Sequence, residues 1–433
     1  MKYLRTIFLF FLLSIGHIHA QQSALPATNE NKNIYQVSLS KQKINSKGKF
    51  NGLVILVEFQ DTVFTISNTA KRFREMLNHK GYHYQDAHGS ARDYFIANSD
   101  SSFFPNFKVI GPIRLSKPMA YYGKNGDNGE EIHAGEMVME ACQLASSKIK
   151  FSKYDSNGDG FVDMIYLFFA SHCENENSTH KEYIWAHAGN IADSCLVLDG
   201  KTIGRYACSS EYIGKINDEK KQIATIGTFC HEFSHILGLP DFYNTTSGSG
   251  MTPGSLSLMD RGNYLNSGKC PAGYSAFEKE YVGWLDVPQI EMQDSITSIV
   301  LSPVGSYTCN DTLPCAFKVT IPDSEEYFYF ENRQNQRWDQ YLPGTGLLIY
   351  HVDMSDKEAW DKNKVNTDYK HPNYQILRSG GKYETNYQNI PFPGKKQKST
   401  LSPPPIWKGG NAFFELENIR EEGNLIKFNL IKK

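Results

Sequence analysis

The 433-residue sequence predicts an α+β domain followed by an all-β, sandwich-like region. Up to about residue 285, runs of strand-forming residues alternate with segments whose apolar residues recur at helical spacing. From residue 286 to residue 433 the pattern changes to short strands separated by turns, which is typical of β-sandwiches. Apolar residues make up 40% of the chain, enough for one large core or two ordinary ones.

The first 20 residues have the features of a secretory signal peptide. Lys2 and Arg5 precede an apolar stretch from Ile7 to Ile15, and Ala20 precedes a suitable cleavage point. The stretch is short for a bilayer span, and no later segment reaches the length of a transmembrane helix. We therefore expect a secreted or periplasmic protein, delivered through its signal peptide and without a membrane span.

Residues 21–48 are polar and lack helical or strand periodicity, so we interpret them as a mobile leader or a short propeptide. The ordered domain, residues 49–285, is predicted to begin with a buried strand. Its first elements are expected to be a strand at 51–60, helices at 73–77 and 91–97, a strand at 108–115, a helix at 130–148 and a strand at 164–169.

An acidic loop precedes the strand expected at 164–169. Its oxygen donors are Asp155, Asn157, Asp159, the Phe161 carbonyl and Asp163. Donors at alternate positions around two glycines suit a hard cation, and we expect a structural calcium ion here. The loop is not an EF-hand, because the twelfth position lacks the usual glutamate and a strand replaces the second helix. The alternative is a turn rich in Asn, Asp and Gly that needs no metal.

One segment combines two histidines, a glutamate, a glycine and an aspartate in the pattern HExxHxxGxxD. On a helix, His231 and His235 lie on one face, so both imidazoles can bind one zinc ion. Glu232 can approach a metal-bound water without binding the metal, as a general base must. A left-handed turn at Gly238 sends the chain back, so that Asp241 can supply a third ligand. The pattern predicts the active site of a zinc peptidase.

The alternative for this segment is an amphipathic core helix with two hydrogen-bonded histidines. The glycine and the aspartate at the required offsets disfavour it, as do the apolar residues around the histidines. A buried helix that presented His, Glu and His without a metal would contain unpaired polar groups, at a considerable cost in free energy.

Met259 follows the predicted zinc helix after a loop rich in Thr, Ser and Gly. A methionine in a tight turn at this distance is typical of metzincins, where it forms an apolar floor beneath the metal. A lone methionine is usually part of the core, so this feature only supports a zincin or metzincin-like fold. A helix expected at 273–284 closes the catalytic unit.

The C-terminal region is predicted from strands alone, at 296–301, 327–332, 346–352, 413–416 and 425–430. Cys309 and Cys315 bracket a turn-like loop and are the expected local disulfide of an exported protein. The net charge of −2 and the absence of a large basic cluster exclude nucleic acid as a partner.

Nearly the whole mature sequence resembles the immune inhibitor A family of secreted bacterial metallopeptidases. The matching motifs lie at 90–95, 109–112, 121–123, 155–163, 184–187, 231–243, 257–264, 274–280, 283–285, 331–334, 342–349 and 365–366. The resemblance implies zinc on His231 and His235, with Glu232 as catalytic base. Asp241 then occupies the position of the metzincin third ligand, and Glu278 is the alternative, because a more distant glutamate is the other common zincin solution.

Three departures from the family pattern affect the expected site. Residues 171–177 replace a glycine-rich segment at the rim of the cleft. Arg261 stands two residues past the methionine, where many metzincins have a tyrosine, so Tyr264 and Arg261 are the candidates to stabilise the oxyanion. The leader is short for a full latency domain.

We therefore expect a secreted zinc-dependent endopeptidase that hydrolyses extracellular proteins through a zinc-activated water, with Glu232 as general base. Its substrates are expected to be extended polypeptides that add along a strand edge. One alternative is a secreted binding or adhesion protein whose β region recognises a protein or glycan ligand, and the presence of Glu232 disfavours it. The other is a zinc hydrolase that acts on amides other than proteins.

Overall fold

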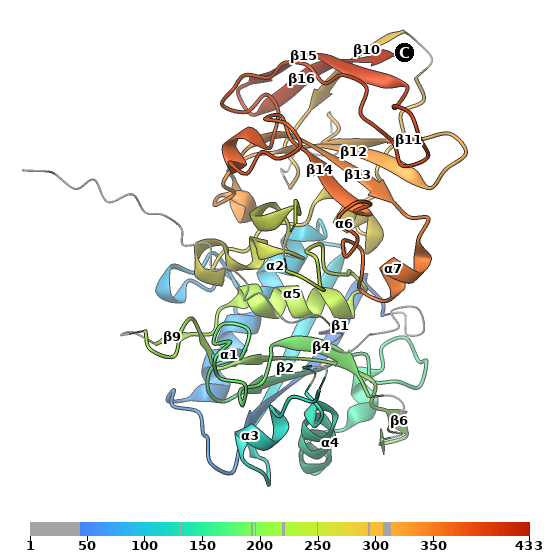
Figure 1. Ribbon diagram of the computed structural model, residues 1–433. Coiled ribbons are helices and arrows are strands. Elements are labelled where there is room, and N and C mark those ends of the chain that lie inside the picture. The colour runs from blue at the N-terminus through green and yellow to red at the C-terminus, as the bar shows by residue number, and fades with distance from the viewer. Residues whose placement is uncertain are drawn as a thin grey trace, which may run out of the picture.

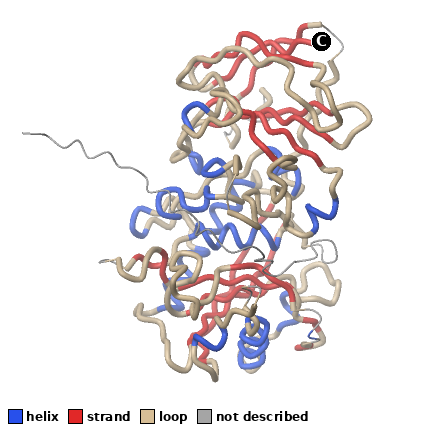
Figure 2. Tube along the Cα trace, viewed as in Figure 1, coloured by secondary structure: helices blue, strands red, loops and turns tan. Residues whose placement is uncertain are grey.

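The computed structural model describes residues 44–127, 129, 131–191, 194, 196–218, 221–248, 250–292, 295–305 and 313–433. The predicted signal peptide, and the predicted leader up to residue 43, lie outside these residues. Figure 2 shows strands gathered towards both ends of the molecule, with most of the helices between them. Among the described residues, no helix is long and apolar enough to cross a membrane.

A five-stranded sheet is the framework of the N-terminal half. In spatial order its strands are β2 (Phe103–Arg114), β1 (Gly48–Glu58), β3 (Ile165–Phe169), β7 (Arg205–Ser210) and β4 (His187–Asn190). The first four strands are parallel, whereas β4 pairs antiparallel with β7. All five residues of β3 are buried, because a parallel sheet covered on both faces has no solvent side.

Helices cover both faces of this sheet (Figure 1). On one face pack α1 (Thr69–Asn78), α2 (Ala91–Asn98) and α5 (Ile226–Ile236), and on the other α3 (Met119–Tyr122) and α4 (Ala134–Ala145). Side chains of β1 alternate between the two cores: Val54 lies on the α5 side and Leu53 on the α4 side. The sheet therefore presents an apolar face to α5.

The helix predicted at 273–284 is shorter in the structure. It is α6 (Ala276–Tyr281), and its start is fixed by a capping box in which the Ser275 side chain accepts from the Glu278 N–H. The Glu278 carboxylate in turn accepts from the Ser275 N–H. Gly283, with φ of 82°, ends the helical segment.

Beyond residue 285 the chain forms two antiparallel sheets. One contains β10 (Ile296–Leu301), β16 (Leu425–Lys432) and β15 (Phe414–Glu422), and the other β11 (Ala316–Thr320), β12 (Glu326–Arg333), β13 (Gly346–Asp353) and β14 (Tyr374–Leu377). Apolar residues of both sheets form one cluster, in which Phe330 contacts Phe414 and Phe428. The sequence predicted an α+β domain followed by an all-β region, and the structure confirms the coarser point: a chain of mixed helices and strands with a sheet-rich C-terminal region.

Shorter elements connect these layers. They are the hairpin strands β5 (Val197–Leu198) and β6 (Lys201–Thr202), the hairpin strands β8 (Tyr212–Ile213) and β9 (Gln222–Ile223), and the helix α7 (Lys357–Asp361). Cys315 is disulfide-bonded, and the five other described cysteines are free and buried. Cys309, the expected partner of Cys315, lies outside the described residues.

The two halves share one apolar core. Phe242, which follows α5, stacks on Tyr374 of β14 with ring centroids 3.9 Å apart. Phe277 of α6 packs against Tyr374 and against Trp360 of α7. Figure 1 shows α5 and α6 lying between the five-stranded sheet and the strands β12–β14. The C-terminal region is therefore built against the segment that contains the histidines.

Candidate metal centre and active site

One face of α5 is anchored by aromatic packing. Phe229 and Phe233, four residues apart, both contact Phe107 of β2 at centroid distances of 4.9 and 5.4 Å. The helix ends at Ile236, and Gly238 then has φ of 108°, as the sequence predicts for a left-handed turn. These contacts fix the rotation of α5, so the neighbouring histidines point away from the sheet core.

The structure brings His231, His235 and Asp241 together. One ligand atom from each lies within 4.8 Å of the other two, and in the described part of the chain no other group of three His, Cys, Asp or Glu side chains does so. Asp241 Oδ1 is 3.1 Å from His231 Nε2 and 3.4 Å from His235 Nε2. All three side chains are at most 10% exposed, so water does little to stabilise their charges.

The outer ring nitrogens determine the protonation of both imidazoles. His231 Nδ1 donates to the Leu258 carbonyl at 2.8 Å, and His235 Nδ1 donates to the Leu239 carbonyl at 2.8 Å. A carbonyl can only accept, so Nδ1 bears the proton, and in the neutral rings each Nε2 presents a lone pair. Asp241 Oδ1 is buried, and while both rings are neutral no group donates a hydrogen bond to it. Three acceptor atoms thus converge, which is a donor set that fits a zinc ion.

The pKa shifts of Asp241 and His231 also indicate that positive charge stabilises this cluster. Burial alone would raise the pKa of Asp241, but the two imidazoles outweigh it and hold that pKa well below its usual range. Burial would lower the pKa of His231, but the hydrogen bond and charge of Asp241 raise it to about 9. In the absence of a metal ion, the cluster therefore binds a proton tightly.

Glu232 is 6% exposed, and burial raises the pKa of its carboxyl group. A raised pKa makes a carboxylate a stronger base, which suits proton transfer.

Tyr243 is a residue near this site that the sequence did not predict. Burial, and then the nearby charges of Asp241 and Glu232, raise the pKa of its hydroxyl well above the ordinary value. The sequence feature that could have identified Tyr243 is its position two residues after Asp241.

The two residues predicted to stabilise an oxyanion lie on the 3-10 segment Arg261–Gly268. As a whole residue Tyr264 is 40% exposed, yet burial of its phenol, followed by the charge of Glu176, raises its pKa. The charge of Glu232 makes a smaller contribution in the same direction. Arg261 is partly buried, next to Asp260.

Met259 lies in a turn and is completely buried. Its carbonyl accepts from the Phe242 N–H at 2.8 Å, and the preceding carbonyl, of Leu258, orients His231.

Glu278, the alternative third ligand, is not brought to the histidines. Its carboxylate accepts from the Ser257 hydroxyl and from the Ser275 N–H, so it fixes the start of α6 and the turn.

The acidic loop has its own donors. Lys201 Nζ is 2.6 Å from Asp155 Oδ2, and the same carboxylate accepts from the N–H groups of Gly158 and Gly160. Asp159 accepts from the Phe161 N–H at 2.9 Å. Beyond these contacts, Asn157 Nδ2 donates to Asp159 Oδ2, and the Ser156 N–H donates to Asp163 Oδ2. The Asp155 side chain is only 1% exposed.

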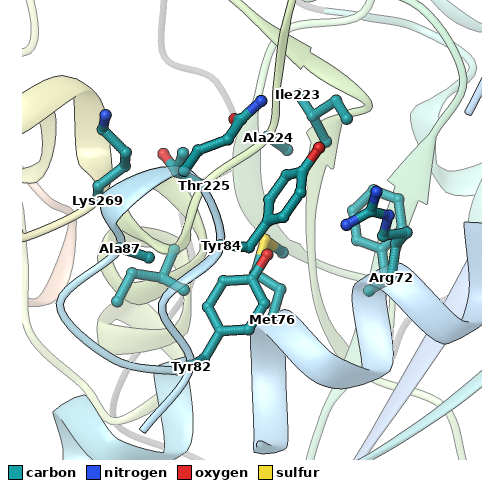
Figure 3. Close-up of a pocket in the computed structure, with 12 residues that line it drawn as sticks. Arg72, Met76, Tyr82, Tyr84, Ala87, Ile223, Ala224, Thr225 and Lys269 are labelled. Atoms are coloured by element: carbon teal, nitrogen blue, oxygen red, sulfur yellow. The ribbon is translucent and has the colours of Figure 1, made fainter.

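A small, mostly apolar hollow lies beside the residues that precede α5 (Figure 3). The Arg72 guanidinium lies over the Tyr84 ring, 4.0 Å from its centroid, and Met76, Ile223 and Lys269 complete much of the wall. None of the three converging ligands lines it. The hollow is therefore separate from the metal centre.

The family model described as "Immune inhibitor A peptidase M6, catalytic domain" matches residues 40–285. The chain belongs to this family. Over 323 residues it is 27% identical to the pre-pro-metalloprotease PrtV of Vibrio cholerae serotype O1, covering 62% of this chain and 34% of that protein. Over 352 residues it is 21% identical to immune inhibitor A of Bacillus thuringiensis subsp. alesti, covering 70% of this chain and 49% of that protein.

The chain thus spans about a third to a half of the length of these curated relatives. The match confirms the resemblance to the immune inhibitor A family. Both histidines, Glu232 and Asp241 lie within the matched catalytic domain of the peptidase M6 family, whereas the strands β10–β16 lie beyond it.

Proposed function

We propose that this protein is a secreted zinc-dependent endopeptidase with a metzincin-like catalytic domain. The observation that most supports it is the convergence of three buried acceptor atoms beside a buried glutamate. Membership of a peptidase family supports the same chemistry. His231, His235 and Asp241 are the proposed zinc ligands, and residues 1–20 are proposed as the signal for export. When bound, zinc supplies Lewis-acid activation of a water and of the scissile carbonyl.

Glu232 takes the proton of the attacking water and returns it to the leaving amine. Its burial favours proton uptake, because desolvation raises the pKa of the carboxyl group and makes the carboxylate a stronger base. The hydroxyls of Tyr243 and Tyr264 are the proposed hydrogen-bond donors to the oxyanion, with Arg261 as the alternative from the sequence pattern.

We propose extended polypeptides as substrates. Within the described residues, β4 is the last strand of the five-stranded sheet and is antiparallel to its neighbour, so a peptide can add beside it as a further strand. The order β2-β1-β3-β7-β4 and the buried Met259 turn support the metzincin-like assignment. A protein or glycan ligand for the C-terminal region and calcium at the acidic loop stay predictions.

The test replaces Glu232 by Ala in the full chain. Activity on unfolded casein is expected to fall at least ~100-fold, the scale of losing a general base, while zinc content stays that of the parent. For comparison, hydrolysis of a panel of small amides is measured with and without chelator. Retained casein hydrolysis by the variant would contradict the mechanism. Chelator-sensitive activity confined to small amides would instead indicate an amidase, and no activity at all a binding protein.

A further inference from the structure

One segment of the C-terminal region contacts a proposed metal ligand. Between β13 and β14 the chain makes an excursion, residues 354–373. Asp353 anchors its base: one carboxylate oxygen accepts from His371 Nε2 at 2.7 Å, and its carbonyl accepts from Trp360 Nε1 at 2.8 Å. Trp360 is 2% exposed and packs on Phe242. The excursion is therefore fixed at both its base and its middle.

Asn363, on this excursion, contacts the proposed third ligand twice. Its Nδ2 donates to Asp241 Oδ2 at 2.7 Å, and its Oδ1 accepts from the Asp241 N–H at 2.6 Å. The backbone N–H requires an acceptor, so the orientation of the amide is determined by chemistry. The two residues are 122 positions apart in the sequence.

Other contacts dock the same segment without touching the carboxylate. The Asn363 carbonyl accepts from Thr245 Oγ1 at 2.9 Å, and Asn366 Nδ2 donates to the Phe242 carbonyl at 2.8 Å. Asn244 Nδ2 donates to the Thr367 carbonyl at 3.1 Å. These bonds hold the chain that follows Asp241, whereas the Asn363 side chain contacts both the backbone N–H and the carboxylate of Asp241 itself.

We propose that Asn363 is a positioning residue of the metal centre and that the C-terminal region thereby completes it. This inference rests on the proposed zinc ligands. Asn363 engages Asp241 Oδ2, so that Oδ1 is the oxygen presented to the imidazoles. Hydrogen-bonding partners of metal ligands orient those ligands, and losing one typically weakens metal binding about 10- to 100-fold.

Asparagine is suited to this position by shape and by backbone conformation. It offers one donor and one acceptor on a short side chain, which aspartate and serine cannot reproduce in this geometry. Its φ of 55° lies in the left-handed region, which asparagine tolerates better than most residues. Glycine tolerates the same φ without strain, so Asn363→Gly removes the side chain and leaves the backbone acceptable.

The experiment measures zinc affinity by competition with a chromogenic chelator, using the full chain with zinc as the probe. Asn363→Gly removes both contacts, and Asn363→Asp keeps the acceptor but replaces the donor by an oxygen. Asn366→Ala is the matched control, because it loosens the same segment without touching the carboxylate. Melting temperatures of the metal-free proteins measure docking separately.

Both Asn363 variants are expected to bind zinc about 10- to 100-fold more weakly. Asn366→Ala is expected to lower the metal-free melting temperature while its zinc affinity stays near that of the parent. Parent-like zinc affinity in Asn363→Gly overturns the proposal, and so does a loss of affinity that follows melting temperature equally in all three variants. A parent that binds no zinc, or His235→Ala that binds it as well as the parent, overturns the proposed function, and the role of Asn363 with it.

Discussion

The histidine cluster and the acidic loop both have the ligand spacing of a metal site, yet the structure equips them in opposite ways. At the cluster, His231, His235 and Asp241 direct acceptor atoms at one point, and Asp241 Oδ1 has no donor while both rings are neutral. In the loop, Asp155 is already paired with the Lys201 ammonium. Spacing therefore identifies possible ligands, but the donors that surround them decide whether a cation is needed.

The largest effect is expected from removing the aspartate at the cluster. Asp241→Ala should weaken zinc binding more than ~100-fold, since a ligand itself matters more than its hydrogen-bonding partner. Glu278→Ala, measured in parallel, should keep its zinc. Its melting temperature should fall, because the Glu278 carboxylate caps α6 and accepts a hydrogen bond from the Ser257 hydroxyl. If Glu278→Ala releases zinc while Asp241→Ala retains it, the third ligand has to be reassigned.

A smaller effect is expected at the acidic loop. Calcium is still predicted there, but it has to compete with the Lys201 ammonium for Asp155, so we expect the melting temperature of the parent to rise less with calcium, at fixed zinc, than that of a variant without the ammonium. Lys201→Met leaves the buried carboxylate without its cation, and this variant should gain stability from calcium. A ligand at a hundred times its dissociation constant stabilises by ~2.7 kcal/mol, or several degrees. Equal calcium shifts in both proteins would show that Lys201 does not compete for this site.

The smallest effect is expected at Glu176, a buried carboxylate for which burial outweighs the nearby charge of Lys215. Burial raises its pKa to about 7, despite the hydrogen bond from the Gly214 N–H. Because the folded pKa lies above the unfolded value, its contribution to stability is complete below pH ~4.5 and is lost as pH rises to about 7. Glu176→Gln should therefore raise the melting temperature at pH 8 and change it little at pH 4.5. A uniform gain at both pH values would exclude titration as the cause.

The sequence predicts those parts of the site that depend on local geometry. Helical spacing joins His231 to His235, and the left-handed turn at Gly238 returns the chain so that Asp241 reaches them, as the structure has it. Buried strands such as β1 and β3 are predicted from their continuous apolar runs.

Other features depend on tertiary packing and have no local signal. Lys201 and Asn363 reach their partners from elements far along the chain, so no spacing rule could find them. The strand β4 consists of His187, Ala188, Gly189 and Asn190, a run too short and too small to show apolar alternation. Part of the helix expected at 130–148 is not helical either, because Glu131 forms a β-bridge with Asn125.

The contact between Asn363 and Asp241 has a consequence for the timing of biosynthesis. A ribosome adds about 5–20 residues per second, so the 122 residues between the two positions take roughly 6–24 s to make. During that interval the nascent chain has its histidines and its glutamate but lacks the residue that orients the third ligand. A product that ends prematurely in the β region lacks it permanently. On the proposed role of Asn363, tight zinc binding therefore has to wait until most of the chain has been made, and incomplete copies without Asn363 should bind zinc more weakly.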